Sequence, residues 1–189
     1  MVGALNFNSG EILIDGISIK NNPIDCKKNI AYVPDNPDIY NYLTGLQYLN
    51  FVCDIYGVNK QERSERIKKY SDVFELTANL NDVIGSYSHG MKQKLVIISA
   101  LVHNPKFLVL DEPFVGLDPI ATHNLKNIMR EICMNGGAIF FSTHILEVAE
   151  KLCDKVVIIS KGKLVAQGKM QDVIGDKSLE NTFLDIENG

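Results

Sequence analysis

The sequence lacks the features that would place it in a membrane, in a secretory pathway or on nucleic acid. No apolar stretch among its 189 residues approaches the roughly 18–20 residues that a membrane-spanning helix needs. The first residues, Met1–Asn6, lack the basic start and the long apolar run of a secretory signal. The formal net charge of -4 disfavours a protein that binds nucleic acid through its phosphates, so no nucleic-acid partner is expected.

The sequence also lacks a C-x-x-C pair, internal repeats and low-complexity segments. Its four cysteines are widely separated: Cys26, Cys53, Cys133 and Cys153. This spacing indicates buried or incidental thiols in a reducing cytosol, not a disulfide framework or a zinc site. Hydrophobic residues make up 46% and charged residues 22%, which is typical of an ordinary globular protein and excludes general disorder. Length and composition predict one acidic, cytosolic domain.

Alternating apolar runs and helical patterns predict an α/β fold. Continuous apolar runs, typical of parallel strands covered on both faces, occupy residues 107–110, 138–141 and 156–159. Helical patterns lie between them, over 119–133 and 145–152. A turn at 160–163 leads into a last strand at 164–166, and the polar tail after Asp176 is expected to fray.

The first half of the chain predicts a hairpin, a strand and then helices. Asp15-Gly16 separates two alternating apolar stretches over residues 11–19, a strong hairpin signal. A strand is expected at 29–33, and helices are expected over 44–56, over 60–76 and after Ser88. The predicted architecture is a parallel sheet with a mainly helical insertion at about residues 40–100 and a small antiparallel β part.

Asp111 and Glu112 follow the apolar run 107–110 directly. Open α/β sheets bind ligands at the carboxyl ends of their strands. An aspartate in that place could hold Mg²⁺ through its water shell, and the next carboxylate could accept a proton from an attacking water. Taken alone, the pair is a weak signal and is better explained as a solvated acidic turn.

Three further clusters have both a functional and a structural reading. Ser88, followed by His89 and Gly90 at a helix start, could bind an anion or could simply cap the helix. Asp118, in Gly-Leu-Asp-Pro, could be only the cap of the next helix. His144 follows the apolar run 138–141 and could stabilise charge on a phosphate, although a lone histidine is usually structural.

The order of these clusters resembles the motifs of the ATP-binding cassette (ABC) ATPase family. Tyr87–Met91 is similar to the family signature, usually Leu-Ser-Gly-Gly-Gln, and Leu108–Glu112 is similar to the Walker B strand. Gly116–Asp118 matches the D-loop, and His144 matches the switch histidine. The resemblance covers the chain from end to end and is closest to cassettes of antibiotic and multidrug exporters.

The resemblance implies a P-loop NTPase-like fold and an ATPase that uses ATP and Mg²⁺. Asp111 would hold Mg²⁺, Glu112 would polarise the attacking water and His144 would contact the γ-phosphate. The nucleotide-contacting residues of the signature and the D-loop would be Ser88, His89, Gly90, Met91 and Asp118.

The resemblance also implies partners and a location. Cassettes of this family pair head to tail around two nucleotides, so a second ABC ATPase subunit is expected. A transmembrane subunit (permease) is expected because the chain has no span of its own. The protein would be cytoplasmic and peripheral on the inner face of the cell membrane. The segment Thr44–Leu49 resembles the exporter branch, so export is the expected direction.

The phosphate-cradling loop of the family is missing from the sequence. The pattern G-x-x-x-x-G-K-[ST] occurs nowhere, and Met1–Leu5 resembles residues that follow that loop, late in its helix. We therefore expect residues 1–189 to be a single, incomplete ABC ATPase domain that lacks the N-terminal strands and P-loop and is inactive alone. Removal of the strand that feeds the loop would leave an apolar sheet edge prone to aggregation. A naturally degenerate subunit is the alternative to truncation.

Two positions depart from the family in smaller ways. Asp35 stands where the family usually has a glutamine near the Mg²⁺; a carboxylate can meet a cation or its water but cannot donate as an amide does. His89 replaces a signature glycine, adding bulk and a group that could contact a phosphate at low pH.

Two other functions compete with a transporter ATPase. A catalytically silent cassette could donate Ser88–Met91 to the nucleotide of a complete partner. A ribosome-acting cassette protein of the translation-factor type is disfavoured, because such proteins carry two cassettes in tandem with a charged linker.

Overall fold

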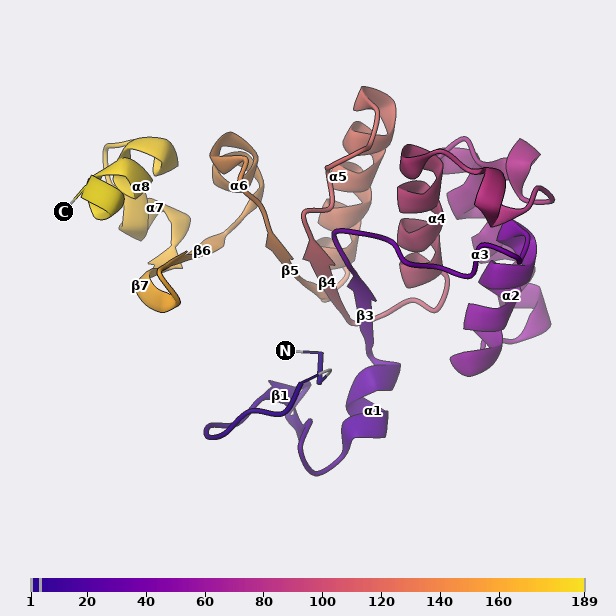
Figure 1. The fold of residues 1–189 in the computed structure, drawn as a ribbon. Helices are drawn as coiled ribbons and strands as arrows, with labels where there is room; N and C mark the ends of the chain where they lie inside the picture. The colour runs from indigo at the N-terminus through magenta and orange to yellow at the C-terminus, as the bar shows by residue number, and fades with distance from the viewer. Residues whose placement is uncertain (1, 4, 189) are drawn as a thin grey trace. The chain divides into compact units, whose positions relative to one another are not determined.

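The computed structural model describes residues 2–3 and 5–188 as two compact units, Met1–Ser142 and Thr143–Gly189 (Figure 1). Met1 and Ala4, part of the stretch likened to the end of the P-loop helix, lie outside the described residues. No helix in the described part combines the length and apolarity needed to cross a bilayer.

The first unit begins with the predicted hairpin. Strands β1 (Leu13–Ile14) and β2 (Ile17–Ser18) pair antiparallel. Asp15 (φ 52°) and Gly16 (φ 76°) form the turn, and both have the positive φ that a tight hairpin of this hand requires. Helix α1 (Pro23–Lys28), which the sequence analysis did not anticipate, follows the hairpin.

A three-stranded parallel sheet positions the candidate site. Its order is β3 (Ile30–Val33), β4 (Phe107–Asp111), β5 (Ala138–Ser142). Strand β4 lies in the middle, and its residues Leu108, Val109 and Leu110 are buried. In this register Asp111, at the end of β4, lies opposite Ser142, at the end of β5.

Helices fill the interval between β3 and β4, as predicted for residues 40–100. They are α2 (Gly45–Ile55), α3 (Lys60–Val73), the 3-10 turns η1 (Thr77–Asn79) and η2 (Ile84–Ser86), and α4 (His89–Leu101). Thr44 and Gln47 cap the N-terminus of α2 with a reciprocal capping box. Helix α4 packs against α2, α3 and β3, and its second half is almost wholly buried, so this helix joins the helical segment to the sheet.

Helix α5 (Pro119–Met134) connects β4 to β5 and packs against β5 (Figure 1). Its Pro119 stands at the first helical position, where the missing N–H costs no hydrogen bond. The prediction that β5 is covered on both faces is wrong: Ala138, Phe140 and Ser142 are exposed. Among the described strands β5 pairs only with β4, so it is an edge strand.

The second unit corrects two further predictions. It contains α6 (Leu146–Leu152), β6 (Lys155–Ser160), β7 (Lys163–Lys169), α7 (Met170–Ile174) and α8 (Leu179–Asn188). The run 156–159 is not a parallel strand, because the turn at Lys161 and Gly162, both with positive φ, returns the chain and pairs β6 antiparallel with β7.

The tail after Asp176 is helical instead of frayed. Leu179 is 1% exposed and belongs to the apolar cluster of this unit, together with Ala149, Ile158 and Met170. The backbone N–H of Leu179 donates to the Glu150 carboxylate at 2.7 Å, which fixes the start of α8. Packing and this hydrogen bond stabilise a helix whose sequence looked polar.

Candidate functional site

The carboxyl end of β4 carries two acids that are held by a serine from the neighbouring strand. The Ser142 hydroxyl donates to Asp111 Oδ1 and accepts the backbone N–H of Glu112 at 3.2 Å. Ser142 therefore orients the Asp111 carboxylate and fixes the chain where it leaves the sheet. Sequence analysis missed Ser142, although its place at the end of the next predicted strand was a usable signal.

The segment after β4 turns sharply toward α5. Glu112 has φ 44°, in the left-handed region that only a few non-glycine residues adopt. Its carbonyl accepts from Val115 N–H at 3.1 Å, and Phe114, which is buried, packs edge-on against Phe141. A strained backbone at a chemically useful side chain is typical of functional sites.

Ser88 begins α4 as an N-cap. Its Oγ accepts the backbone N–H of Met91 at 3.2 Å, so the structural reading of this serine as a cap is confirmed. Capping leaves the functional reading open. The N–H groups of His89 and Gly90 have no acceptor within the helix, and the dipole adds partial positive charge. Ser88 and His89 are exposed, so this turn is accessible to an anion.

The start of α4 touches the segment that precedes α5. A Cβ added to Gly90 would lie 2.7 Å from the Gly116 carbonyl oxygen, and one added to Gly116 would lie 2.7 Å from Cδ2 of His89. Gly116 also has φ 78°, so both its conformation and its surroundings require glycine. The structure thus brings together two of the predicted clusters, Ser88–Met91 and Gly116–Asp118.

Asp118 is held by two partners within the chain. Its Oδ1 accepts the N–H of Ala121 at 2.8 Å, capping α5, and its Oδ2 pairs with Lys94 Nζ at 2.6 Å. The Ala121 N–H and the Lys94 ammonium hold the pKa of this carboxyl below its usual range. Lys94 is on α4, one turn beyond the signature-like residues. Sequence analysis did not single it out, because only the tertiary structure pairs it with Asp118.

Asp35 lies at the same end of the sheet as Asp111. It follows β3 by two residues, and Val33 of β3 is opposite Leu110 of β4. Among the described residues, no three His, Cys, Asp or Glu side chains gather as a metal site. Mg²⁺ in nucleotide sites usually takes one or two carboxylates and completes its shell with phosphates and water, so Asp111 and Asp35 fit that ion chemically.

His144 belongs to the second unit, in the connection between β5 and α6. Beside it, Thr143 Oγ1 accepts the N–H of Ile145 at 3.1 Å and shapes the connection. A contact between His144 and a γ-phosphate stays a prediction.

Known proteins resemble this chain in sequence and in fold. The family model described as "ABC transporter" matches residues 1–115. The uncharacterized ABC transporter ATP-binding proteins YdbJ and YthP of Bacillus subtilis (strain 168) are 34% and 35% identical to it. The alignment with YdbJ covers 99% of this chain and 59% of YdbJ; that with YthP covers 85% and 67%. The chain therefore spans about three fifths of the length of YdbJ.

Two solved structures are similar to this chain in fold. A structure titled as the ATP binding subunit of an ABC transporter superimposes with a TM-score of 0.94 at 32% identity, covering 98% of this chain and 80% of that one. The cbiO1 protein of Clostridium perfringens, titled as part of the ABC transporter complex cbiONQ, superimposes with a TM-score of 0.74 at 23% identity, covering 99% and 77%. The second likeness supports the fold alone.

Proposed function

We infer the function of this chain from the premise that it belongs to the ABC transporter family. We propose that it is an ATP-binding and ATP-hydrolysing subunit that drives membrane transport, in the direction of export. Residues 1–189 would belong to one ABC ATPase domain, with a helical subdomain over about 40–100.

One observation carries the proposal: the close contact between Gly90 and Gly116. It joins the exposed first turn of α4 to the short segment that begins at Glu112. A triphosphate site needs N–H groups that bind phosphate oxygens and carboxylates that hold a metal and a water. Both kinds of group lie in the first unit, where the contact between Gly90 and Gly116 connects them. The carboxylates would serve this chain's own nucleotide, and the N–H groups would serve that of a second cassette.

We assign each of the four candidate residues a role in ATP hydrolysis that follows from its chemistry. Bound MgATP supplies the transferable phosphoryl group and the divalent charge. Asp111, oriented by Ser142, would hold the metal, and Asp35 would meet it through water. The Glu112 carboxylate would orient the attacking water and accept its proton. His144 would stabilise charge on the γ-phosphate.

The first turn of α4 would serve the nucleotide of a second cassette. Ser88 and Gly90 would bind phosphate oxygens, and His89 and Met91 would border them. Asp118 would couple the two sites of the dimer. We propose a second ABC ATPase subunit and a permease as partners, with the protein on the cytoplasmic face of the membrane. The relatives YdbJ and YthP, which are named as ABC transporter ATP-binding proteins, support such partners.

A second candidate is a silent cassette that only donates its α4 turn. The observation in its favour is that the 189 residues contain no G-x-x-x-x-G-K-[ST] pattern, whereas the Ser88 turn is fully formed. Either way, we propose that the chain alone does not turn over ATP, because catalysis of phosphoryl transfer depends on the phosphate cradle.

Nucleotide-dependent pairing tests the proposal. The chain is mixed with a complete family cassette that carries a P-loop and a glutamine in place of its catalytic glutamate. Light scattering after gel filtration should find a one-to-one complex with MgATP and none without it. Ser88→Arg should abolish the complex. Asn59→Arg, at the N-cap of α3, is the matched control and should not. Absence of any ATP-dependent complex would refute the proposed function.

Hydrolysis separates the two candidates. An active complete cassette replaces the glutamine variant, and ATP turnover of the mixture is measured with this chain as wild type or as Glu112→Gln. A fall in turnover with Glu112→Gln assigns this chain a catalytic site. Unchanged turnover that still requires Ser88 identifies a silent donor.

A further inference from the structure

The loop between β3 and α2, residues 34–44, is hydrogen-bonded to residues 84–85, which lie shortly before α4. The carbonyl of Asn41 accepts the N–H of Gly85 at 2.8 Å, and the carbonyl of Leu43 accepts the N–H of Ile84 at 2.8 Å. A Cβ on Gly85 would lie 3.1 Å from the Asn41 carbonyl oxygen, so the approach is tight. The 3-10 turn η2, which holds the loop, ends two residues before Ser88.

A side-chain hydrogen bond connects the same loop to α4 itself. Nζ of Lys92 donates to Oδ1 of Asn41 at 2.8 Å, across 51 residues of sequence. The backbone N–H of Lys92 donates to the Ser88 carbonyl at 3.0 Å and so completes the first turn of the helix. Lys92 is therefore part of the anion-binding turn through its backbone and part of the loop contact through its side chain.

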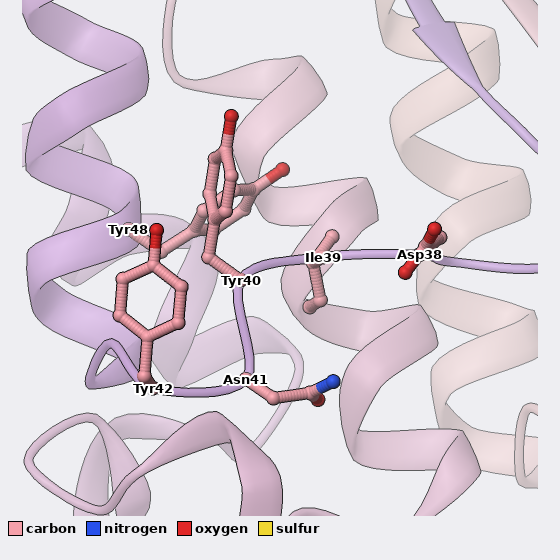
Figure 2. A pocket seen from close by; sticks show the side chains of 6 residues that line it. All are labelled: Asp38, Ile39, Tyr40, Asn41, Tyr42 and Tyr48. Carbon is pink, nitrogen blue, oxygen red and sulfur yellow. The ribbon is translucent and has the colours of Figure 1, made fainter.

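Asn41 also lines a pocket of about 430 Å³, together with Asp38, Ile39, Tyr40, Tyr42 and Tyr48. Figure 2 shows the tyrosines grouped, while the Asn41 side chain points away from the Tyr42 ring. The Tyr40 ring contacts the rings of Tyr42 and Phe51, each at 5.8 Å between centroids. Asn41 therefore connects two features: it lies beside the tyrosines of the pocket, and its side chain is hydrogen-bonded to Lys92 in the first turn of α4.

We propose that Asn41 and Lys92 are positioning residues for the Ser88–Met91 turn. Their hydrogen bond holds this turn in the orientation in which it meets the nucleotide of a second cassette, and it ties that orientation to the Tyr40–Tyr42 loop. The inference rests on the proposed function, because it concerns how the same turn binds.

A purely structural role would look different. The Lys92–Asn41 bond is exposed to solvent, and such bonds contribute little to folding stability. The backbone bonds at Gly85 and Ile84 remain when the side-chain bond is removed. Loss of this bond should therefore change the orientation of the turn and leave the melting temperature almost unchanged.

The test titrates MgATP into the mixture of this chain with the glutamine variant of a complete cassette and reads out complex formation. Lys92→Ala and Asn41→Ala should each raise the half-maximal ATP concentration roughly fivefold, the loss expected for one ordinary, solvent-exposed hydrogen bond. The double variant should be no worse than either single variant, because both remove the same bond. Asn41→Ala keeps every charge, so its effect cannot come from lost attraction to phosphate.

Two further variants sharpen the test. Lys92→Arg should retain most of the effect of the wild-type residue. Lys68→Ala is the matched control, because Lys68 is exposed and its bond to Asp72, at 3.1 Å, stays within α3. All melting temperatures should agree within about 2 °C.

The outcomes distinguish the two proposals. If the wild-type chain forms no ATP-dependent complex, the proposed function fails and this inference fails with it. If Ser88→Arg abolishes the complex but Lys92→Ala and Asn41→Ala behave as wild type, only this inference is overturned. Multiplicative effects in the double variant, or losses that follow a lower melting temperature, would also overturn it.

Discussion

Strands β4 and β5 have the same length and nearly the same apolar character, yet they are buried very differently. Leu108 and Leu110 of β4 are each 1% exposed, whereas Phe140 of β5 is 38% exposed. Strand β4 has a neighbour on both sides, and β5 is an edge strand in the described sheet. The candidate site includes residues from both strands, because Asp111 ends the buried strand and its partner Ser142 ends the exposed one. Asp111 therefore ends a buried strand, but its carboxylate is oriented by a hydrogen bond from an exposed one.

Core truncations should show the largest contrast between the two strands. Leu110→Ala is expected to lower the free energy of unfolding by about 3 kcal/mol, since it opens a cavity in a fully packed position. Phe140→Ala should cost only about 1.5 kcal/mol, because the ring already contacts water. Urea denaturation of the two variants measures both losses. Equal losses would contradict the edge position of β5.

Acid titration extends the comparison to the helical segment. The His103 ring stacks on Tyr56 with 3.6 Å between ring centroids, and burial lowers the pKa of His103 to about 4. Above pH ~6.5 the imidazole is neutral in both the folded and the unfolded chain, so its titration does not change the stability there. As the pH falls toward 4, only the unfolded chain takes up the proton, and stability should fall by at most about 3 kcal/mol.

Unfolding in urea at several pH values checks this expectation, with His103→Phe as the control. The variant should lose the part of the pH dependence that lies between about 4 and 6.5. The same pH dependence in both proteins would show that other groups are responsible.

Ser142 is where the buried and the exposed strand meet at the site, and its removal should have the smallest effect on stability. Ser142→Ala breaks the bonds to the Asp111 carboxylate and the Glu112 N–H and should cost about 1 kcal/mol. Ser142→Thr keeps the hydroxyl and should cost less. Thermal melting compares the two; an alanine variant as stable as wild type would mean that the hydroxyl does not support the acids.

Local patterns predicted the elements whose signals lie close together in sequence. Asp15-Gly16 identified the hairpin, and Ser88 and Asp118 were recognised as helix caps because capping depends on residues within one turn. The run 156–159 was wrongly predicted to be a parallel strand, because its apolar residues resemble those of 107–110. The turn at Gly162 decided its pairing instead.

The residues of the site that could not be identified from the sequence are those that depend on tertiary contacts. Ser142 is important because strand register places it opposite Asp111, and Lys94 is important because α4 and α5 start side by side. The bond between Lys92 and Asn41 spans 51 residues and has no local signal at all. Helix α8 was missed because Leu179 is buried by its own unit, which a polar tail does not suggest.

Proximity of Ser88 to a bound nucleotide is the most direct test of the account. Cysteine is introduced by Ser86→Cys, at an exposed position two residues before Ser88, with the exposed native thiol removed by Cys133→Ser. A second cysteine is placed beside the P-loop of a complete family cassette. A short thiol cross-linker should join the two chains with MgATP and leave them separate without nucleotide. Cross-linking that is absent with MgATP, or that is equally strong without it, would contradict the claim that the first turn of α4 binds the triphosphate.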